Sequence, residues 1–94
     1  MQQTAPRPRP DEPVEDLLRD LLVDVLSLSR SRVDGFDRDT ALFGALPEFD
    51  SMAVANLLTG LEERLGVLIE DDDVEAEDFA TFGKLLALAE RLAA

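Results

Sequence analysis

The sequence predicts an all-α fold, a small bundle of three main helices and one short helix, with a long loop between the first and second main helices. Two observations predict this fold. Apolar residues recur along three separate stretches at the spacing that gives an α-helix one apolar face. No stretch of useful length alternates apolar and polar residues as a half-buried strand does.

The first main helix is expected from about Pro13 to Ser29. Proline is favoured at the first helical position, and Asp11 and Glu12 lie near the positive end of the helix dipole. The residues expected on one apolar stripe are Leu17, Leu18, Leu21, Leu22, Val25 and Leu28.

A connection of about twenty residues, Arg30 to Asp50, follows, and a loop of that length in a compact domain is usually functional. Asp34-Gly35 predicts a turn, and Thr40 to Phe43 a short helical turn. Apolar side chains spread along the loop would pin it across the helix ends, namely Val33, Phe36, Leu42, Phe43, Leu46 and Phe49.

The second main helix is expected from Ser51 to Leu65, with Gly66 as a left-handed C-terminal cap. Its apolar positions are Val54, Leu57, Leu58, Leu61 and Leu65. A short helix is expected around Val74 to Phe79, and Thr81 is a good N-cap for the last helix. The buried face of that last helix is expected to hold Phe82, Leu85, Leu86, Ala89 and Leu92.

Length and composition set limits on function. The 94 residues allow one domain, with residues 1–12 expected as a disordered Pro/Arg tail and residues 13–94 as the folded part. The chain has no Cys and no His, which excludes disulfides, thiolate metal sites and the commonest general base. An enzyme in its own right is therefore not expected, and no catalytic residue is predicted.

The charge of −12 belongs to the folded part, because Arg7 and Arg9 cancel Asp11 and Glu12. It argues against nucleic acid and anionic membranes as partners and favours basic protein surfaces. No apolar run reaches membrane-spanning length and no signal peptide is visible, so a cytoplasmic monomer is expected. The acidic run Glu70 to Asp73 lacks the EF-hand spacing and is expected to be a solvated loop without a metal.

Ser51 is the candidate site. Asp and Ser are both preferred N-caps, so one interpretation of Asp50-Ser51 is that it only starts the helix. A reciprocal capping box is absent, because Ala53 and Val54 stand where it needs Glu or Gln. The free N–H groups and the dipole of a helix start would stabilise a phosphodiester on the serine oxygen.

Four segments resemble the acyl carrier protein family: Leu42-Phe43-Gly44, Asp50-Ser51-Met52, Leu61-Glu62-Glu63-Arg64-Leu65-Gly66-Val67 and Phe79-Ala80-Thr81-Phe82. The resemblance covers about Val14 to Leu92. It implies an acyl-carrier-like bundle in which Ser51 anchors 4′-phosphopantetheine, donated from coenzyme A by a Mg²⁺-dependent phosphopantetheinyl transferase. The thiol of that arm would hold an acyl group as a thioester, and the helices would open slightly to shelter the acyl chain.

The implied partners are that transferase and acyl-activating or acyl-transferring enzymes with basic docking surfaces. The residues expected to dock them are Asp50, Met52, Glu62 and Glu63.

The chain also departs from the family pattern. The usual Gly two residues before the Asp is missing, and Pro47 stiffens the approach instead. Met52 replaces the usual Leu, and the early exposed positions of the helix are expected to be Ala53 and Asn56, neither of them acidic. The stretch from Leu46 to Met52 looks like carriers encoded beside exosortase and exopolysaccharide systems. Two alternatives remain: an aminoacyl or peptidyl carrier of nonribosomal synthesis, and an unmodified acidic helical adaptor.

Overall fold

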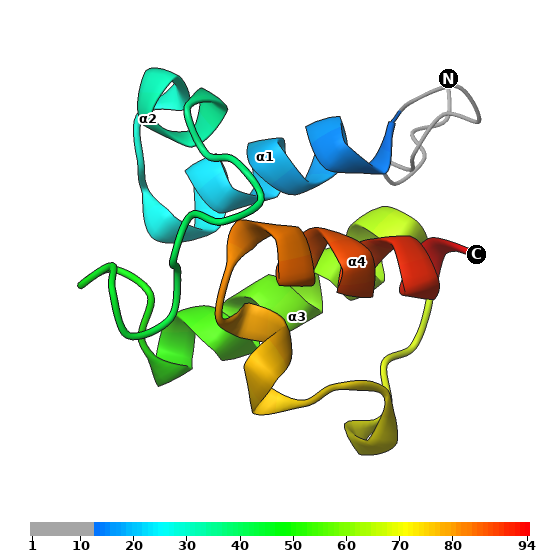
Figure 1. The fold of residues 1–94 in the computed structure, drawn as a ribbon. Helices are drawn as coiled ribbons and strands as arrows, with labels where there is room; N and C mark the ends of the chain where they lie inside the picture. The colour runs from blue at the N-terminus through cyan, green and yellow to red at the C-terminus, as the bar shows by residue number, and fades with distance from the viewer. Residues whose placement is uncertain (1–12) are drawn as a thin grey trace.

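The computed structural model describes residues 13–94, so the predicted tail lies outside the described residues. Within this range the chain forms four α-helices and two 3-10 helices and no strand, apart from one isolated bridge between Ala41 and Thr81 (Figure 1). The predicted all-α fold is confirmed. In chain order the elements are α1 (Val14–Leu26), α2 (Arg30–Asp34), α3 (Ser51–Leu65), η1 (Asp71–Asp73), η2 (Ala76–Phe79) and α4 (Phe82–Ala93).

The core lies between α1, α3 and α4, which contact one another pairwise (Figure 1). Burying a leucine side chain contributes about 1.5–3 kcal/mol, so the three apolar stripes are the main source of stability. Gly60 lets α3 approach α1 closely, because a Cβ at that position would lie 2.6 Å from Leu21 Cδ1. The residues with no more than 1% exposure are Leu18, Leu22, Val33, Leu42, Leu57, Leu61, Phe82, Leu85, Leu88 and Ala89.

The first helix is shorter than predicted, and a second helix follows it. Helix α1 ends at Leu26, and Ser27 adopts a left-handed conformation with φ 56°. Ser29 then caps α2, its hydroxyl accepting the Arg32 N–H at 3.2 Å. Helix α2 was not predicted, because its five residues bury only Val33 and give no periodic pattern.

The loop after α2 is tied to the start of α4. The first N–H groups of a helix have no acceptor within the helix. Here Phe82 N–H donates to Thr40 O at 2.9 Å and Gly83 N–H donates to Arg38 O at 3.0 Å. A Cβ on Gly83 would lie 2.8 Å from that Arg38 oxygen, so the close approach requires glycine.

Two more backbone bonds continue this contact toward η2. Leu42 N–H donates to Ala80 O at 2.9 Å, and Phe43 N–H donates to Phe79 O at 3.0 Å. The backbone of residues 40–43 therefore pairs with residues 79–82, and the helical turn predicted there forms two residues later, where Leu42 O accepts the Ala45 N–H at 3.0 Å and the Leu46 N–H at 2.9 Å. The expectation that apolar side chains pin the loop is confirmed for Val33, Phe36, Leu42 and Phe49, which are buried, and is wrong for Phe43, which is exposed.

A partly buried arginine holds α2 against α1. The Arg19 guanidinium donates to Val33 O at 2.6 Å and to Phe36 O at 3.0 Å, and it pairs with Glu15 at 2.7 Å. It also lies 4.5 Å from the centre of the Phe82 ring, a cation–π geometry. One side chain therefore connects α1, the end of α2 and the start of α4.

The acidic run Glu70 to Asp73 forms the 3-10 helix η1 rather than an irregular loop. Asp73 accepts the Glu70 N–H at 2.9 Å in a capping box that starts η1. The predicted short helix is present as η2, and Thr81 caps α4 by accepting the Lys84 N–H at 3.2 Å. None of the helices within residues 13–94 has the length and apolar character needed to cross a membrane.

Candidate attachment site at the start of α3

Ser51 is the first residue of α3 and is exposed. The capping role belongs to Asp50, whose Oδ1 accepts the Ala53 N–H at 2.9 Å. Among residues 13–94 no hydrogen bond uses the Ser51 hydroxyl, and the N–H groups of Ser51 and Met52 have no acceptor within the helix. The hydroxyl is thus free at the positive end of a fifteen-residue helix.

Buried residues on both sides fix the position of Ser51. Phe49 is 2% exposed, and its ring makes edge-on contacts with Phe43 at 6.0 Å and with Phe79 at 6.3 Å between centroids. Ala53, two residues after the serine, is 6% exposed. The serine is therefore held between two core anchors, although its own side chain faces solvent.

The loop before the serine is also tied to α2. Arg32 Nη1 lies 3.2 Å from Glu48 Oε2 in an exposed ion pair. A hydrogen bond from its own backbone, together with Arg32, holds the pKa of Glu48 below its ordinary value. This contact joins the unpredicted α2 to the approach to Ser51.

The fold matches that of a known protein. A solution NMR structure of a holo acyl carrier protein from Nitrosomonas europaea is 38% identical to this chain, with a TM-score of 0.72. The match covers 83% of this chain and 92% of that protein. The chain belongs to the acyl carrier protein family. No family model and no curated protein matches the chain, so the assignment rests on this structure.

The four expected docking residues of this carrier differ in exposure and in whether their side chains already make hydrogen bonds within the protein. Asp50, Ser51 and Met52 are contiguous, and Met52 is 70% exposed, whereas Asp50 is engaged as the cap. Glu62 and Glu63 lie at the other end of α3. The Glu62 carboxylate accepts the Ile69 N–H at 2.8 Å and so holds the loop that follows α3, whereas Glu63 is exposed.

The exposed face of α3 carries little charge near the serine. The prediction that Ala53 is exposed is wrong, because its methyl group packs into the core. Asn56 is exposed as predicted. Besides Ser51, the exposed positions in the first three turns are Met52, Ala55, Asn56 and Thr59, all of them uncharged.

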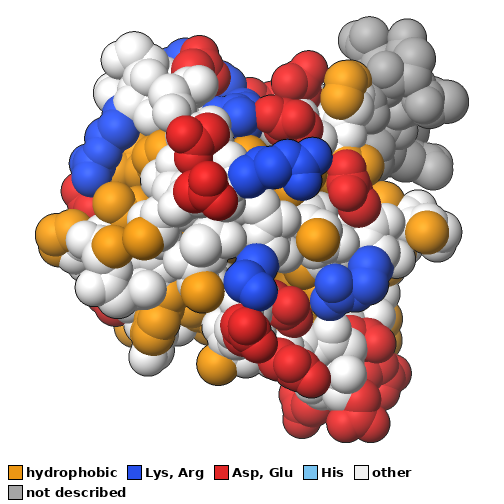
Figure 2. Space-filling model, in the orientation of Figure 1, with side chains coloured by type: hydrophobic (Ala, Val, Ile, Leu, Met, Phe, Trp, Pro, Cys, Tyr) orange, Lys and Arg blue, Asp and Glu red, His pale blue; other side chains and the backbone are white. Residues whose placement is uncertain are grey.

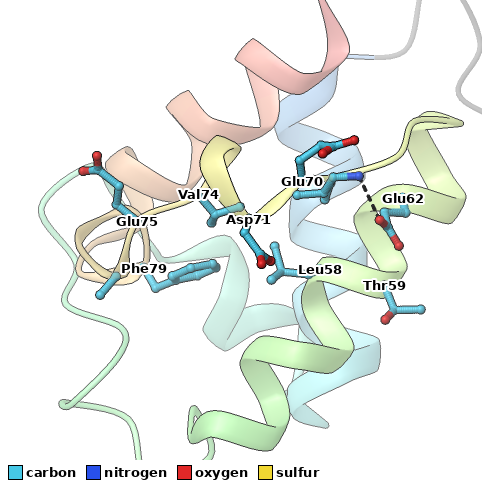
Figure 3. Close-up of a pocket in the computed structure, with 10 residues that line it drawn as sticks. Leu58, Thr59, Glu62, Glu70, Asp71, Val74, Glu75 and Phe79 are labelled. Atoms are coloured by element: carbon cyan, nitrogen blue, oxygen red, sulfur yellow. Dashed lines mark hydrogen bonds between the residues drawn. The ribbon is translucent and has the colours of Figure 1, made fainter.

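A cleft of about 300 Å³ lies between α3 and the segment that contains η1 and η2. The side chains of Leu58, Val74 and Phe79 line it, and Glu70, Asp71 and Glu75 stand around it (Figure 3). Leu58 follows Ser51 by about 10 Å along the helix axis. Phe79 also contacts Phe49, so the cleft and the serine share one aromatic cluster.

Acidic groups do not form a metal centre in the part of the chain that the structure describes. No three His, Cys, Asp or Glu side chains within residues 13–94 are placed to hold a metal ion. The acidic side chains of the η1 region instead gather at the lower right of the molecule, away from the start of α3 (Figure 2).

Proposed function

We propose that this protein holds acyl groups as thioesters on 4′-phosphopantetheine attached to Ser51 and presents them to partner enzymes. The observation that carries the proposal is the free Ser51 hydroxyl, exposed at a helix start that Asp50 already caps. The match to a holo acyl carrier protein supports it. The carrier supplies position, and the arm, when attached, supplies the thiol that bears the acyl group.

The residues around Ser51 fit a phosphodiester. In the modification, the Ser51 oxygen bonds to phosphorus and loses its proton, the pyrophosphate linkage of coenzyme A breaks, and adenosine 3′,5′-bisphosphate leaves. The two free N–H groups at the start of α3 and its helix dipole stabilise the anionic product. Phe49 and Ala53 keep the oxygen at one place on the surface, which an enzyme acting on it requires.

The partners under this proposal are a Mg²⁺-dependent phosphopantetheinyl transferase and enzymes that load or remove the acyl group. A net charge of −12 draws basic surfaces toward the carrier and raises association rates. Asp50, Met52, Glu62 and Glu63 form the docking side of α3. The carrier acts as a cytoplasmic monomer that performs no reaction itself.

Intact-mass spectrometry tests the proposal directly. The protein is incubated with coenzyme A, Mg²⁺ and a broad-specificity phosphopantetheinyl transferase. We expect a mass increase of one phosphopantetheine in the wild type and in Ser31→Ala, a control at another exposed serine. Ser51→Ala should gain nothing. An unmodified wild type beside an active transferase would instead favour an acidic adaptor.

Loading assays separate the two kinds of carrier. The holo form is offered to acyl-activating enzymes and to aminoacyl-activating enzymes. Stable acyl loading without aminoacyl loading supports the proposal, and the reverse supports a carrier of nonribosomal synthesis. Both outcomes use the same serine.

A further inference from the structure

We propose that Met52 is a site of reversible oxidation by peroxides, and that its sulfoxide slows attachment of the arm to Ser51. The oxidation step follows from the chemistry and the exposure of this side chain. Its effect on Ser51 rests on the proposed function, because it concerns the transferase reaction. Loading of the carrier then responds to oxidants through the residue next to the attachment serine.

Met52 is the one readily oxidised side chain in the folded part of the chain. Thiols and thioethers are the side chains that peroxides attack. The chain has no Cys, and its two methionines are Met1 and Met52. Met1 lies outside the described residues, so Met52 carries the single side-chain sulfur of residues 13–94. Because the chain also lacks Trp, Tyr and His, mild oxidation of the folded part should be confined to this one atom.

The Met52 side chain is open to oxidants in solution. It is 70% exposed, and α3 begins at the lower left edge of the molecule in Figure 1. Among the residues that the structure describes, Met52 belongs neither to the buried core nor to the partly buried apolar side chains packed against it. Oxidation therefore needs no local unfolding. A polar sulfoxide at this position also leaves the packing of the core unchanged, unlike a sulfoxide on a buried methionine.

The chemical step is a two-electron oxidation of the Met52 sulfur. A lone pair of the sulfur attacks one oxygen of hydrogen peroxide, the O–O bond breaks and an S–O bond forms. Sulfur gives up two electrons, and the second oxygen leaves as water with both protons. Methionine sulfoxide reductases reverse the step with a thiol reductant. Two thiols then become a disulfide, and the sulfoxide oxygen leaves as water.

The new oxygen changes the electrostatics at the start of α3. Long side chains on a helix lean toward its N-terminal end, so the Met52 side chain is directed toward the end that holds Ser51. The N–H groups of both residues have no acceptor within the helix. The sulfoxide oxygen is an acceptor that competes for these donors, which otherwise stabilise the phosphodiester. It also loses its hydration when an enzyme covers Met52 to reach the neighbouring hydroxyl, which is unfavourable.

Peroxide treatment of the apo protein tests the modification itself. The apo form is used because the thiol of the arm also reacts with peroxide. Wild type and Met52→Leu, which keeps Met1, are treated with hydrogen peroxide, and mass spectrometry with fragmentation locates each added oxygen. We expect one oxygen on Met52, added at a rate within about tenfold of that of N-acetylmethionine amide, as for an unhindered thioether. A slower rate would overturn the proposal.

Transferase kinetics test the effect on Ser51. After the peroxide is removed, kcat/KM for arm attachment is measured for treated and untreated samples of each protein. Treatment should lower kcat/KM of the wild type about tenfold. It should leave Met52→Leu at its own untreated value, whatever that value is, and this control also reports any effect of oxidised Met1. Methionine sulfoxide reductases of both stereospecificities, supplied with dithiothreitol, should restore the treated wild type.

The outcomes separate the oxidation proposal from the carrier function. If the wild type carries the Met52 sulfoxide and stays within about threefold of its untreated rate, the effect on attachment is overturned while the carrier function stands. An equal loss in treated Met52→Leu would overturn it too, because the loss then arises elsewhere. So would a lower melting temperature by circular dichroism in the oxidised wild type, which would assign the loss to unfolding. If the untreated wild type is not modified by an active transferase, the carrier function fails, and the fragmentation result alone decides whether Met52 is oxidised.

Discussion

The Asp50 carboxylate accepts a hydrogen bond from the Ala53 N–H at 2.9 Å, and this bond leaves the hydroxyl of the adjacent Ser51 free. Two residue types that both favour the N-cap position stand side by side, and the structure separates their roles. Asp50 caps the helix, and Ser51 is exposed at the start of that helix with its hydroxyl free.

This division of roles predicts different effects for two substitutions at Asp50. Asp50→Ala should lower the free energy of unfolding by about 1 kcal/mol, because the Ala53 N–H loses its acceptor. Asp50→Asn should lower it far less, since asparagine caps about as well. Urea denaturation followed by circular dichroism measures both. Equal losses in the two variants would show that the charge of Asp50, not its capping bond, stabilises α3.

Arg19 should be the most sensitive polar side chain of the fold. Arg19→Met removes the donors to Val33 O and Phe36 O while retaining much of the apolar stem. Phe36 O then loses its Arg19 donor, and Val33 O keeps only the Phe36 N–H at 3.0 Å, so the substitution should cost about 2 kcal/mol. The same denaturation experiment measures this loss.

Arg30→Met is the matched control for Arg19→Met. Arg30 pairs with Asp20 at 2.6 Å, but it is exposed and binds no backbone carbonyl. Its denaturation midpoint should stay close to that of the wild type. Equal losses in the two variants would contradict the conclusion that Arg19 holds α2 against α1.

Ser27 offers a stabilising substitution. Its φ of 56° is left-handed, a conformation that costs an L-residue about 1–2 kcal/mol. Ser27→Gly should therefore raise the free energy of unfolding by about 0.5–1 kcal/mol, and Ser27→Val should lower it. Thermal melting of both variants checks the sign. A destabilised Ser27→Gly would mean that the serine side chain makes a contribution larger than the backbone strain.

The sequence predicted the long elements better than the short ones. The bounds of α3 agree with the prediction because three signals coincide there: an aspartate cap, regular apolar spacing and Gly66 in the left-handed region. Helix α2 and η1 carry no such spacing. They depend on Ser29 and on the Glu70–Asp73 capping box, which are local hydrogen bonds that periodicity does not detect.

The candidate site could be proposed from the sequence, but its surroundings could not. Ser51 is the candidate because of its neighbours in the sequence, and its role stays a prediction. The burial of Ala53 and the exposure of Phe43 depend on tertiary packing, because a small residue on a helix fits either face and an aromatic residue in a loop usually faces the core. The Ile69 contact of Glu62 depends on how the following loop returns, which no local pattern shows.

The cleft between α3 and η2 predicts that the carrier shelters long acyl chains. Its apolar lining of Leu58, Val74 and Phe79 would bury a chain that starts from the Ser51 arm. A protein acylated with a long chain should therefore melt at a higher temperature than one with a short chain. Val74→Phe, which fills the cleft, should remove the difference. Identical melting of the two acylated wild-type forms would contradict sequestration.

The most direct test of the carrier account is the mass of the protein purified from its own cells, before and after hydroxylamine, which cleaves thioesters. We predict a form heavier than the sequence by one phosphopantetheine plus an acyl group, with fragmentation locating the addition on Ser51. Hydroxylamine should remove the acyl group and leave the arm. A native protein with the mass of the bare sequence, in cells that modify another carrier, would contradict the account.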